Sequence, residues 1–507
     1  MNRKILIALI AIVVIIGAGA YLLTNTNQSA NADISVDANA LEDRGNLIVD
    51  SKSLDKNNGL YHTDSADENA VLVKNGGSLK LANSIINKTG DTATTGDDAD
   101  FYGVNSAILV NTNATLDISN VEINTNSKGS NGIFVTNAEA SSTGGDDSAA
   151  SAGSDASQPP EASGGGGDGG QPPEMPDGAS QGSGEGQAPD GNGGGQPGES
   201  TVEGSTQATI KNVKITTHSD KSRGLDATYN GVINAENVII NTDGQSCAAL
   251  ATDRGEGEVH VKNSDINTGV SKTSGRGSPL IYSTGNISVE NTKGTAYVSQ
   301  IACIEGKNSI EVKNSELTGY AEGNRQDGDK YVDLGGVFIY QSMSGDADVG
   351  TSLFTAENSK LSIAEDSSVY KTAPMFHITN TACVIDLTNT ELSFGSGVFL
   401  EASGQNQWGS EGSNGGVAEL NTDNEKIDGN VIVDDISSLN WSMKNTEFKG
   451  AINSTGNTTV NVGEGSTWTL TGDSSVSSLE VSGNIEYGDY SLTVNGQTYN
   501  SENPFKG

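Results

Sequence analysis

The chain has 507 residues, with 65 acidic against 28 basic side chains and a formal net charge of −37. Nucleic acid and anionic membrane surfaces are therefore excluded as main partners, because both are bound through clustered Lys and Arg. The 65 glycines and an aromatic content of 5% favour one elongated repetitive body over several globules with thick cores.

The first segment indicates export. Arg3 and Lys4 precede an uncharged stretch, residues 5–23, that is long enough to cross a bilayer core. Acidic residues follow it, so the positive-inside rule places the rest of the chain outside the cytoplasm. We expect residues 1–32 to be a single-pass signal anchor that tethers an extracellular body to the cell membrane. Cleavage at Ala30–Ala32 would instead give a secreted protein.

Residues 33–70 are expected to form an N-terminal extension and cap, and a repeated phrase follows them. Its pattern is apolar, any, apolar or small, any, Asn, any, any, apolar. The alternation before the Asn is that of a strand with one buried face, and Asn tolerates the left-handed backbone of a turn. The turn asparagines of this series are Asn83, Asn120, Asn212, Asn237, Asn263, Asn314, Asn358, Asn389 and Asn445.

The repeat length identifies the architecture. From Asn212 the phrase recurs at Asn237, Asn263, Asn291 and Asn314, which gives separations of 25, 26, 28 and 23 residues. A unit of that size cannot bury its apolar face alone and has to stack on its neighbours. Asn291 is followed by Gly294 where an apolar residue is expected, so that coil is predicted to be looser or differently turned.

A second strand recurs in each coil, as a small residue followed by apolar alternation, from GIFVTN at Gly132 to GVFLEA at Gly397. Together the two strands resemble the right-handed parallel β-helix of the pectate-lyase-like superfamily, over roughly residues 70–500. The resemblance implies an all-β solenoid of about a dozen coils, with first coils at 71–137 and a main body at 206–455. It implies little about chemistry.

The largest interruption is the segment 138–205, which holds seven of the ten prolines and no basic residue. Such a composition cannot offset its own ordering entropy, so we predict a disordered acidic loop that leaves the rod and returns to it. Shorter inserts follow Asn83, Asn314 and Asn389. In a solenoid, inserts project as loops from one face, where binding usually occurs.

The C-terminal segment 456–507 contains STWTLTGDSSVSSLEVSGNIEYGDYSLTVNG, with Trp468 and Leu470 on one face. This stretch resembles the closing coils of autotransporter passenger domains, and the resemblance does not extend to a membrane barrel. It implies a cap that shields the last sheet edge from pairing with other chains.

Two patterns raise the possibility of an enzyme. Asn241-Thr242-Asp243-Gly244 resembles the first motif of polygalacturonases, but INTNSKG at 123 and INTGVSK at 266 occupy the same place, which favours a repeat turn. No histidine lies between two glycines and no Arg-Ile-Lys is present, so the other polygalacturonase motifs are missing.

A polysaccharide lyase needs a cation to hold a uronate and a base to abstract a proton. Arg223, Asp226, Asp253, Arg254 and Arg276 come from successive coils and would meet on one face. If the protein is an enzyme, Arg223, Asp226, Asp253 and Arg276 are the expected catalytic residues. The alternative is a solvated ladder of mixed charge.

For glycan binding, an exposed ring flanked by amides is the expected feature. Trp408 in GQNQWGSEG, Tyr320 and Tyr331 are the candidates. The alternative is that the Trp408 loop folds back onto the rod. No cofactor or metal site is expected; Ca²⁺ is conceivable at GDDAD, Gly96–Asp100, although a bare acidic loop is favoured. The three separated cysteines predict buried free thiols.

These observations favour a non-catalytic, extracellular, membrane-tethered protein that is similar to adhesin-like surface proteins, with a cell-surface glycan or protein as partner. Carbohydrate is one candidate ligand. A β-helical polysaccharide lyase or glycoside hydrolase is the alternative, and a purely structural envelope component is the third possibility.

Overall fold

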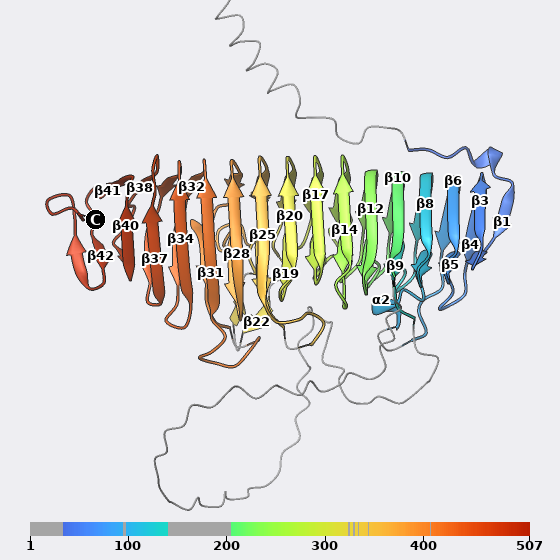
Figure 1. The fold of residues 1–507 in the computed structure, drawn as a ribbon, viewed down its shortest axis with the longest axis horizontal. Helices are drawn as coiled ribbons and strands as arrows, with labels where there is room; N and C mark the ends of the chain where they lie inside the picture. Colours follow the sequence, from blue (N-terminus) through green and yellow to red (C-terminus); the bar gives the residue numbers. More distant parts are fainter. Residues whose placement is uncertain are drawn as a thin grey trace, which may run out of the picture.

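The computed structural model describes residues 34–94, 98–139, 204–322, 325–327, 330–332, 334–342, 344–405 and 407–506. These ranges form an elongated solenoid in which strands from successive coils stack side by side (Figure 1). The expected anchor helix at residues 5–23 and most of the predicted loop 138–205 lie outside the described residues. The described helices are the short η1 (Ala38–Ala40) and α2 (Asp98–Phe101). Neither is long and apolar enough to cross a membrane.

Two long parallel sheets run the length of the rod. Sheet 1 has 21 strands and sheet 2 has 13. The strands of sheet 2 are β2 (Leu47–Asp50), β5 (Val71–Lys74), β7 (Ile108–Asn111), β9 (Ile133–Thr136), β11 (Leu225–Thr228), β13 (Leu250–Thr252), β16 (Ile281–Ser283), β19 (Ala302–Glu305), β24 (Val337–Tyr340), β27 (Phe376–Thr379), β30 (Val398–Ala402), β33 (Asn430–Val433) and β36 (Ile452–Ser454).

Most coils contribute one long strand or two short ones to sheet 1. Its strands are β1 (Asp43–Gly45), β3 (Ser53–Asn57), β4 (Gly59–Thr63), β6 (Ser78–Lys88), β8 (Thr115–Thr125), β10 (Thr206–Thr217), β12 (Gly231–Thr242), β14 (Glu258–Lys262), β15 (Asp265–Thr268), β17 (Asn286–Glu290), β18 (Lys293–Ala296), β20 (Ser309–Lys313), β21 (Glu316–Gly319), β25 (Thr351–Glu357), β26 (Lys360–Ile363), β28 (Thr381–Thr388), β29 (Glu391–Ser393), β31 (Gly416–Asp423), β34 (Ser438–Lys444), β37 (Asn457–Val462) and β40 (Ser478–Val481).

Three small sheets complete the described part. A parallel sheet holds β32 (Lys426–Asp428), β35 (Glu447–Lys449), β38 (Thr467–Thr469) and β41 (Asn484–Glu486). A second contains β39 (Ser474–Val476), β42 (Leu492–Val494) and β43 (Gln497–Tyr499), and a hairpin contains β22 (Arg325–Asp327) and β23 (Lys330–Val332). The strand pairs are parallel except β22–β23 and β42–β43. The antiparallel β42–β43 pair lies in the segment predicted to be the C-terminal cap, where Trp468 and Leu470 are both buried.

The core follows from in-register stacking of like residues. Ile118 pairs with Ile210, and the row continues through Ala235, Val261 and Val289. Because each apolar side chain lies on its equivalent in the next coil, one continuous apolar cluster extends from Leu47 to Val494. The stack begins earlier than the sequence indicated, since β2 within the presumed cap 33–70 already pairs with β5.

The turn asparagines bend sheet 1 at one place in most coils. The nine asparagines of the predicted series have φ between +47° and +56°, a region that Asn adopts more readily than most residues. Their amides also stack, with Asn120 Nδ2 donating to Asn83 Oδ1 and Asn237 Nδ2 to Asn212 Oδ1. The φ of Asn291 (+50°) and of Asn424 (+58°) places both residues in the same conformation.

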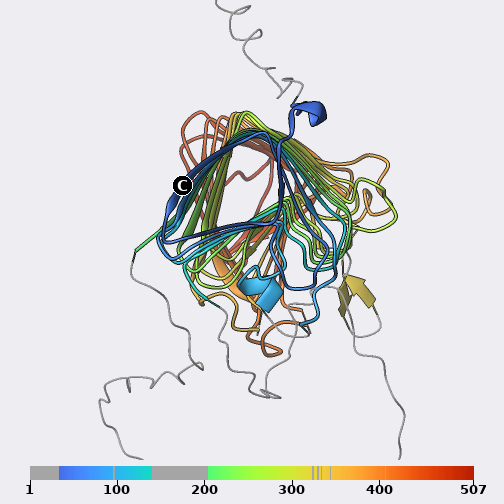
Figure 2. The ribbon, with the colours of Figure 1, turned by 90° about the vertical axis from the view of Figure 1, so that its right-hand side faces the viewer.

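Sheet 2 differs from sheet 1 because its outer face is also covered along much of the rod, although not at β2 or β36 near its ends. Strands β9, β11, β24 and β27 are buried at every position. Viewed along the rod, the coils superpose, and α2 and the β22–β23 hairpin project from the same side (Figure 2). The three cysteines, Cys247, Cys303 and Cys383, are buried thiols that form no disulfide, as predicted.

Candidate functional site

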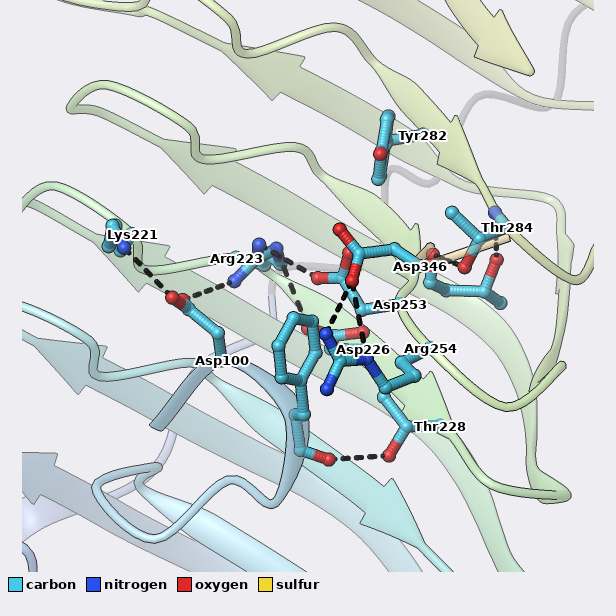
Figure 3. Close-up of polar contacts among 12 residues, drawn as sticks. Asp100, Lys221, Arg223, Asp226, Thr228, Asp253, Arg254, Tyr282, Thr284 and Asp346 are labelled. Atoms are coloured by element: carbon cyan, nitrogen blue, oxygen red, sulfur yellow. Dashed lines mark hydrogen bonds and ion pairs between the residues drawn. The ribbon is translucent and has the colours of Figure 1, made fainter. Parts of the chain in front are cut away.

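A cluster of charged side chains lies against the outer face of sheet 2, at β11 and β13 (Figure 3). Arg223 lies two residues before the start of β11, and its Nη2 lies 2.7 Å from Asp253 Oδ2 in the next coil. Its Nη1 contacts Asp100 Oδ1 of α2 at 3.2 Å, and its Nε is 3.6 Å from Asp226 Oδ2. Lys221 pairs with the second oxygen of Asp100 at 2.9 Å. We call these five residues the Arg223 cluster.

A second ion pair continues the cluster along the rod. Arg254 donates to Asp346 Oδ1 from Nε at 3.2 Å and from Nη2 at 2.7 Å. Its guanidinium also lies 3.9 Å from the ring centre of Phe101, a cation–π contact. Thr228 of β11 donates its hydroxyl to the Phe101 carbonyl at 2.9 Å. These contacts fix α2 and the loop after β24 onto sheet 2.

The electrostatics of the cluster are dominated by burial and by an excess of acids. Burial raises the pKa of Asp226 well above its usual range, and the neighbouring Asp253 raises it further. Burial also raises the pKa of Asp253 to about 6, against the opposing effect of Arg223. Burial acts in the same direction on Asp100, but Arg223 and Lys221 overcome it and hold the pKa of Asp100 below its ordinary value.

The Arg223 cluster is closed to a polymeric substrate. Arg223 is 7% exposed, Asp226 0% and Asp253 3%. A polysaccharide has to bring a sugar carboxylate and the scissile bond within hydrogen-bond distance of the catalytic groups. The structure thus brings three of the four candidate catalytic residues together, but beneath α2 rather than on an open face. The ion pairs of this cluster do not include Arg276, which lies half-buried in the loop between β15 and β16.

The Asn241–Gly244 segment has a structural role in the turn after β12. Asn241 accepts a hydrogen bond from Asn267 Nδ2, its register partner in the next coil, at 3.2 Å. Asp243 Oδ1 accepts the hydroxyls of Ser271 at 2.8 Å and Ser274 at 3.2 Å. The carboxylate therefore supports the loop 269–275 of the following coil.

Trp408 is buried, which corrects the expectation of an exposed ring. Its indole is 7% exposed and packs 5.3 Å from Phe338 and 5.1 Å from Tyr340 between ring centres. Cys303 and Leu334 complete this outer apolar cluster. The loop folds back onto sheet 2 because several apolar side chains project outward there, and no ring face of Trp408 remains open for stacking on a sugar.

The half-buried Tyr320 belongs to an aromatic patch on the surface. It follows β21 directly, and Tyr297 follows β18, the adjacent strand in sheet 1. Their ring centres are 6.1 Å apart with planes tilted by 40°. Lys272 Nζ lies 5.1 Å from each ring centre, and the Tyr320 hydroxyl donates to Asp366 Oδ2 at 3.0 Å. We call Lys272, Tyr297, Tyr320 and Asp366 the tyrosine patch.

The other candidates remain predictions. Tyr331 lies in β23, opposite Gln326, and its side chain falls outside what the structure describes. Of the GDDAD segment, Asp98 and Asp100 begin and continue α2, and Asp100 pairs with basic side chains. Across the described ranges, His, Cys, Asp and Glu side chains form no group of three that could hold a metal ion.

Three partners of these sites were not predicted. Asp100 pairs with the buried Arg223 and Asp346 with the half-buried Arg254, which are 123 and 92 residues away in sequence. Tyr297 is the companion of Tyr320. The inserts that contain Asp100 and Asp346 do not follow the repeat, so no spacing signals their contacts. Tyr297 follows the repeat, and its position three residues after Gly294 was the available signal.

Sequence comparisons name no relative. The chain matches no known protein family, and no curated protein is significantly similar to it.

Proposed function

We propose that this protein is a right-handed parallel β-helix of the pectate-lyase-like class, tethered to the cell membrane with its body extracellular. We propose further that it acts there as a non-catalytic, adhesin-like or envelope-interaction protein, whose partner is a surface glycan or protein. The observation that carries the proposal is the closure of the Arg223 cluster. Its acids and bases pair with one another under α2, as expected of a structural clamp.

The surface charges favour a neutral or cationic partner over a polyanion. Exposed lysines on the rod lie against acids of the adjacent coil, so their charges are largely neutralised. These pairs are Lys74–Asp50, Lys211–Glu236, Lys262–Glu290, Lys293–Glu316, Lys313–Glu357, Lys360–Glu391, Lys426–Glu447, Lys444–Asp423 and Lys449–Asp428. The remaining acidic excess favours neutral or cationic partners over uronate polymers.

A rigid rod suits adhesion by repeated weak contacts. The stacked coils hold surface side chains at fixed spacing, and a membrane tether raises the local concentration of the binding face. The tyrosine patch is the described surface feature that best fits a ligand contact, because its rings come from strand ends and are partly open.

The test uses the purified full-length chain in detergent with a panel of neutral, acidic and amine-bearing polysaccharides, with and without Ca²⁺. Polymer length and protein co-elution are followed by size exclusion. We expect unshortened polymer that co-elutes with the protein in at least one case. Shortened polymer would overturn the non-catalytic proposal and indicate a lyase or hydrolase. Intact polymer that never co-elutes would overturn glycan binding and favour a protein partner or a structural role.

A further inference from the structure

The tyrosine patch is built from four successive coils on one corner of the rod. Lys272 lies in the loop after β15, Tyr297 follows β18, Tyr320 follows β21 and Asp366 follows β26. These four strands are neighbours in sheet 1. The patch is therefore a product of coil stacking.

The backbones of both tyrosines are held by the rod. Tyr297 N–H donates to the Thr268 carbonyl at 2.9 Å, and Tyr320 N–H donates to the Ala296 carbonyl at 3.0 Å. The Tyr320 hydroxyl is held by its hydrogen bond to Asp366. Fixing the two backbones and one hydroxyl in advance lowers the entropic cost of binding a ligand to the rings.

The group that now lies over both rings is a cation. The Lys272 ammonium is equidistant from the two ring centres and donates a long hydrogen bond, 3.4 Å, to the Tyr320 hydroxyl. Aromatic faces attract cations, and pairs of rings next to a carboxylate are suited to organic ammonium groups. The Lys272 side chain is exposed, on a loop bounded by Gly269 and Gly275, so its hold on the rings is easily displaced.

The surroundings match a sugar that bears an amine. Ser271 and Thr273 flank Lys272 in sequence, and their hydroxyls hydrogen-bond to each other at 2.6 Å. Ser368 is exposed two residues after Asp366. Sugar hydroxyls can both donate to and accept from such groups, whereas an alkylammonium side chain of a peptide can only donate to them. Asp366, Asp243 and the net charge of −37 favour a positively charged ligand over a uronate.

We propose that the tyrosine patch binds protonated amino-sugar units of a glycan, with the sugar ammonium replacing Lys272 over the rings of Tyr297 and Tyr320. This inference rests on the proposed function as a glycan-binding surface protein and names the ligand class and the site.

The experiment measures binding of glucosamine tetramers to the full-length chain by calorimetry, with the N-acetylated tetramer as the uncharged comparison. We expect the free-amine tetramer to bind and the N-acetylated one to bind at least tenfold more weakly. Tyr320→Ala should abolish binding of the amine form. Tyr320→Phe, which keeps the ring and loses only the hydroxyl, should retain most of it and guards against misfolding of the alanine variant.

The direction in which Lys272→Ala changes the affinity for the amine tetramer decides between the possibilities. Removing the resident ammonium should tighten amine binding by roughly two- to fivefold, the range of an exposed cation–π contact. Lys371→Ala removes the ammonium that lies 4.9 Å from the Tyr370 ring and should change nothing. Weaker binding by Lys272→Ala, equal binding of the N-acetylated tetramer, or equally tight binding of a lysine tetrapeptide would overturn the proposal. Co-elution of some other glycan that is insensitive to Tyr320→Ala would overturn this site while leaving glycan binding itself in place.

Discussion

Arg223 Nη2 and Asp253 Oδ2 lie 2.7 Å apart, beneath a helix that comes from a segment more than a hundred residues earlier in the chain. The same guanidinium contacts Asp100 of that helix. One arginine therefore joins two coils of the rod to an insert. The insert segment also contains Phe101, which belongs to a buried apolar cluster with Ala138 and Tyr229. The Arg223 cluster thus serves as a clamp between the rod and α2.

Replacing Arg223 by Met should release this clamp. The change leaves three buried carboxylates without their main counter-charge, and breaking a buried ion pair in this way costs about 3–5 kcal/mol. Repeat arrays can open locally. We therefore expect the lost stability to appear as faster amide hydrogen exchange in β11, β13 and α2. The exposed Lys426→Met should change local protection by less than about 0.5 kcal/mol. Unchanged exchange in β11 and α2 would show that Arg223 is not the clamp.

The excess acid of the cluster predicts an unusual pH dependence. The pKa of Asp253 is raised to about 6 in the folded state, against about 4 in an unfolded chain. A group with a raised folded-state pKa binds its proton more tightly when folded, so its stabilising effect is complete below pH 4 and is lost as the pH rises through 6. Local stability of β11 and β13 should therefore fall between pH 4 and pH 7.

Asp253→Asn tests that interpretation. It removes the titrating carboxyl while keeping nearly the same shape, so the fall of local stability between pH 4 and pH 7 should flatten. Hydrogen exchange corrected for its intrinsic pH dependence, or thermal unfolding at several pH values, measures the slope. Asp489→Asn, at an exposed carboxylate, is the matched control. A slope that persists unchanged in Asp253→Asn would rule out Asp253 as its source.

The sequence predicts those parts of the molecule that repeat. Every coil has to meet the same steric conditions, so the apolar alternation and the Asn bend recur and can be read directly. Even the apparent exception at Gly294 follows from stacking. A Cβ there would lie 2.8 Å from the Ile266 carbonyl oxygen and 3.0 Å from Leu280 Cδ1, so neighbouring coils fill the space and the coil is not looser.

The non-repeating parts were not predictable in the same way. Burial of Arg223 depends on Asp100, and burial of Trp408 depends on Phe338 and Tyr340 projecting outward from sheet 2. The unbroken apolar run of β24, VFIY, is consistent with a strand covered on both faces. It does not show which loop covers it. The candidate acids therefore lie together as expected. Their burial and their ion-pair partners depend on inserts whose sequence does not follow the repeat.

Glu425 occupies a buried turn position that most coils fill with a hydroxyl residue. In other coils Ser84, Ser264, Thr292, Ser315, Ser359, Thr390 and Thr446 directly follow the bend asparagine. Their hydroxyls commonly accept an N–H from the preceding coil, as Ser359 does from Ser315 at 3.1 Å. Glu425 reproduces this bond, accepting the Thr390 N–H at 2.7 Å. Burial nevertheless raises the pKa of Glu425 to about 7.

Glu425→Thr should therefore stabilise the rod at and above neutral pH. It keeps a hydrogen-bond acceptor for Thr390 and removes a carboxylate that the fold holds at an unfavourable pKa, a gain of about 2 kcal/mol. The gain should shrink toward zero below pH 4.5, where the carboxyl is protonated in both states. Thermal unfolding at pH 5 and pH 8 measures the difference. Equal effects at the two pH values would mean that packing, and not charge, decides.

Substitutions of a turn asparagine separate two contributions to the bend: the tolerance of left-handed backbone and the stacked amide hydrogen bonds between coils. Asn389 has φ of +52°, its Nδ2 donates to Asn358 Oδ1 at 2.8 Å, and its Oδ1 accepts from Asn424 Nδ2 at 3.0 Å. Asn389→Ala loses both the tolerance of left-handed backbone and the amide bonds, and should cost about 2 kcal/mol. Asn389→Gly keeps the backbone freedom and loses only the exposed amide bonds, so it should cost less than about 1 kcal/mol.

The costs are measured from hydrogen-exchange protection of β28 and β31, with Asn453→Ala on the exposed side of β36 as the control. Equal losses for Ala and Gly would assign the bend to the amide ladder alone, because strain at positive φ would then contribute nothing.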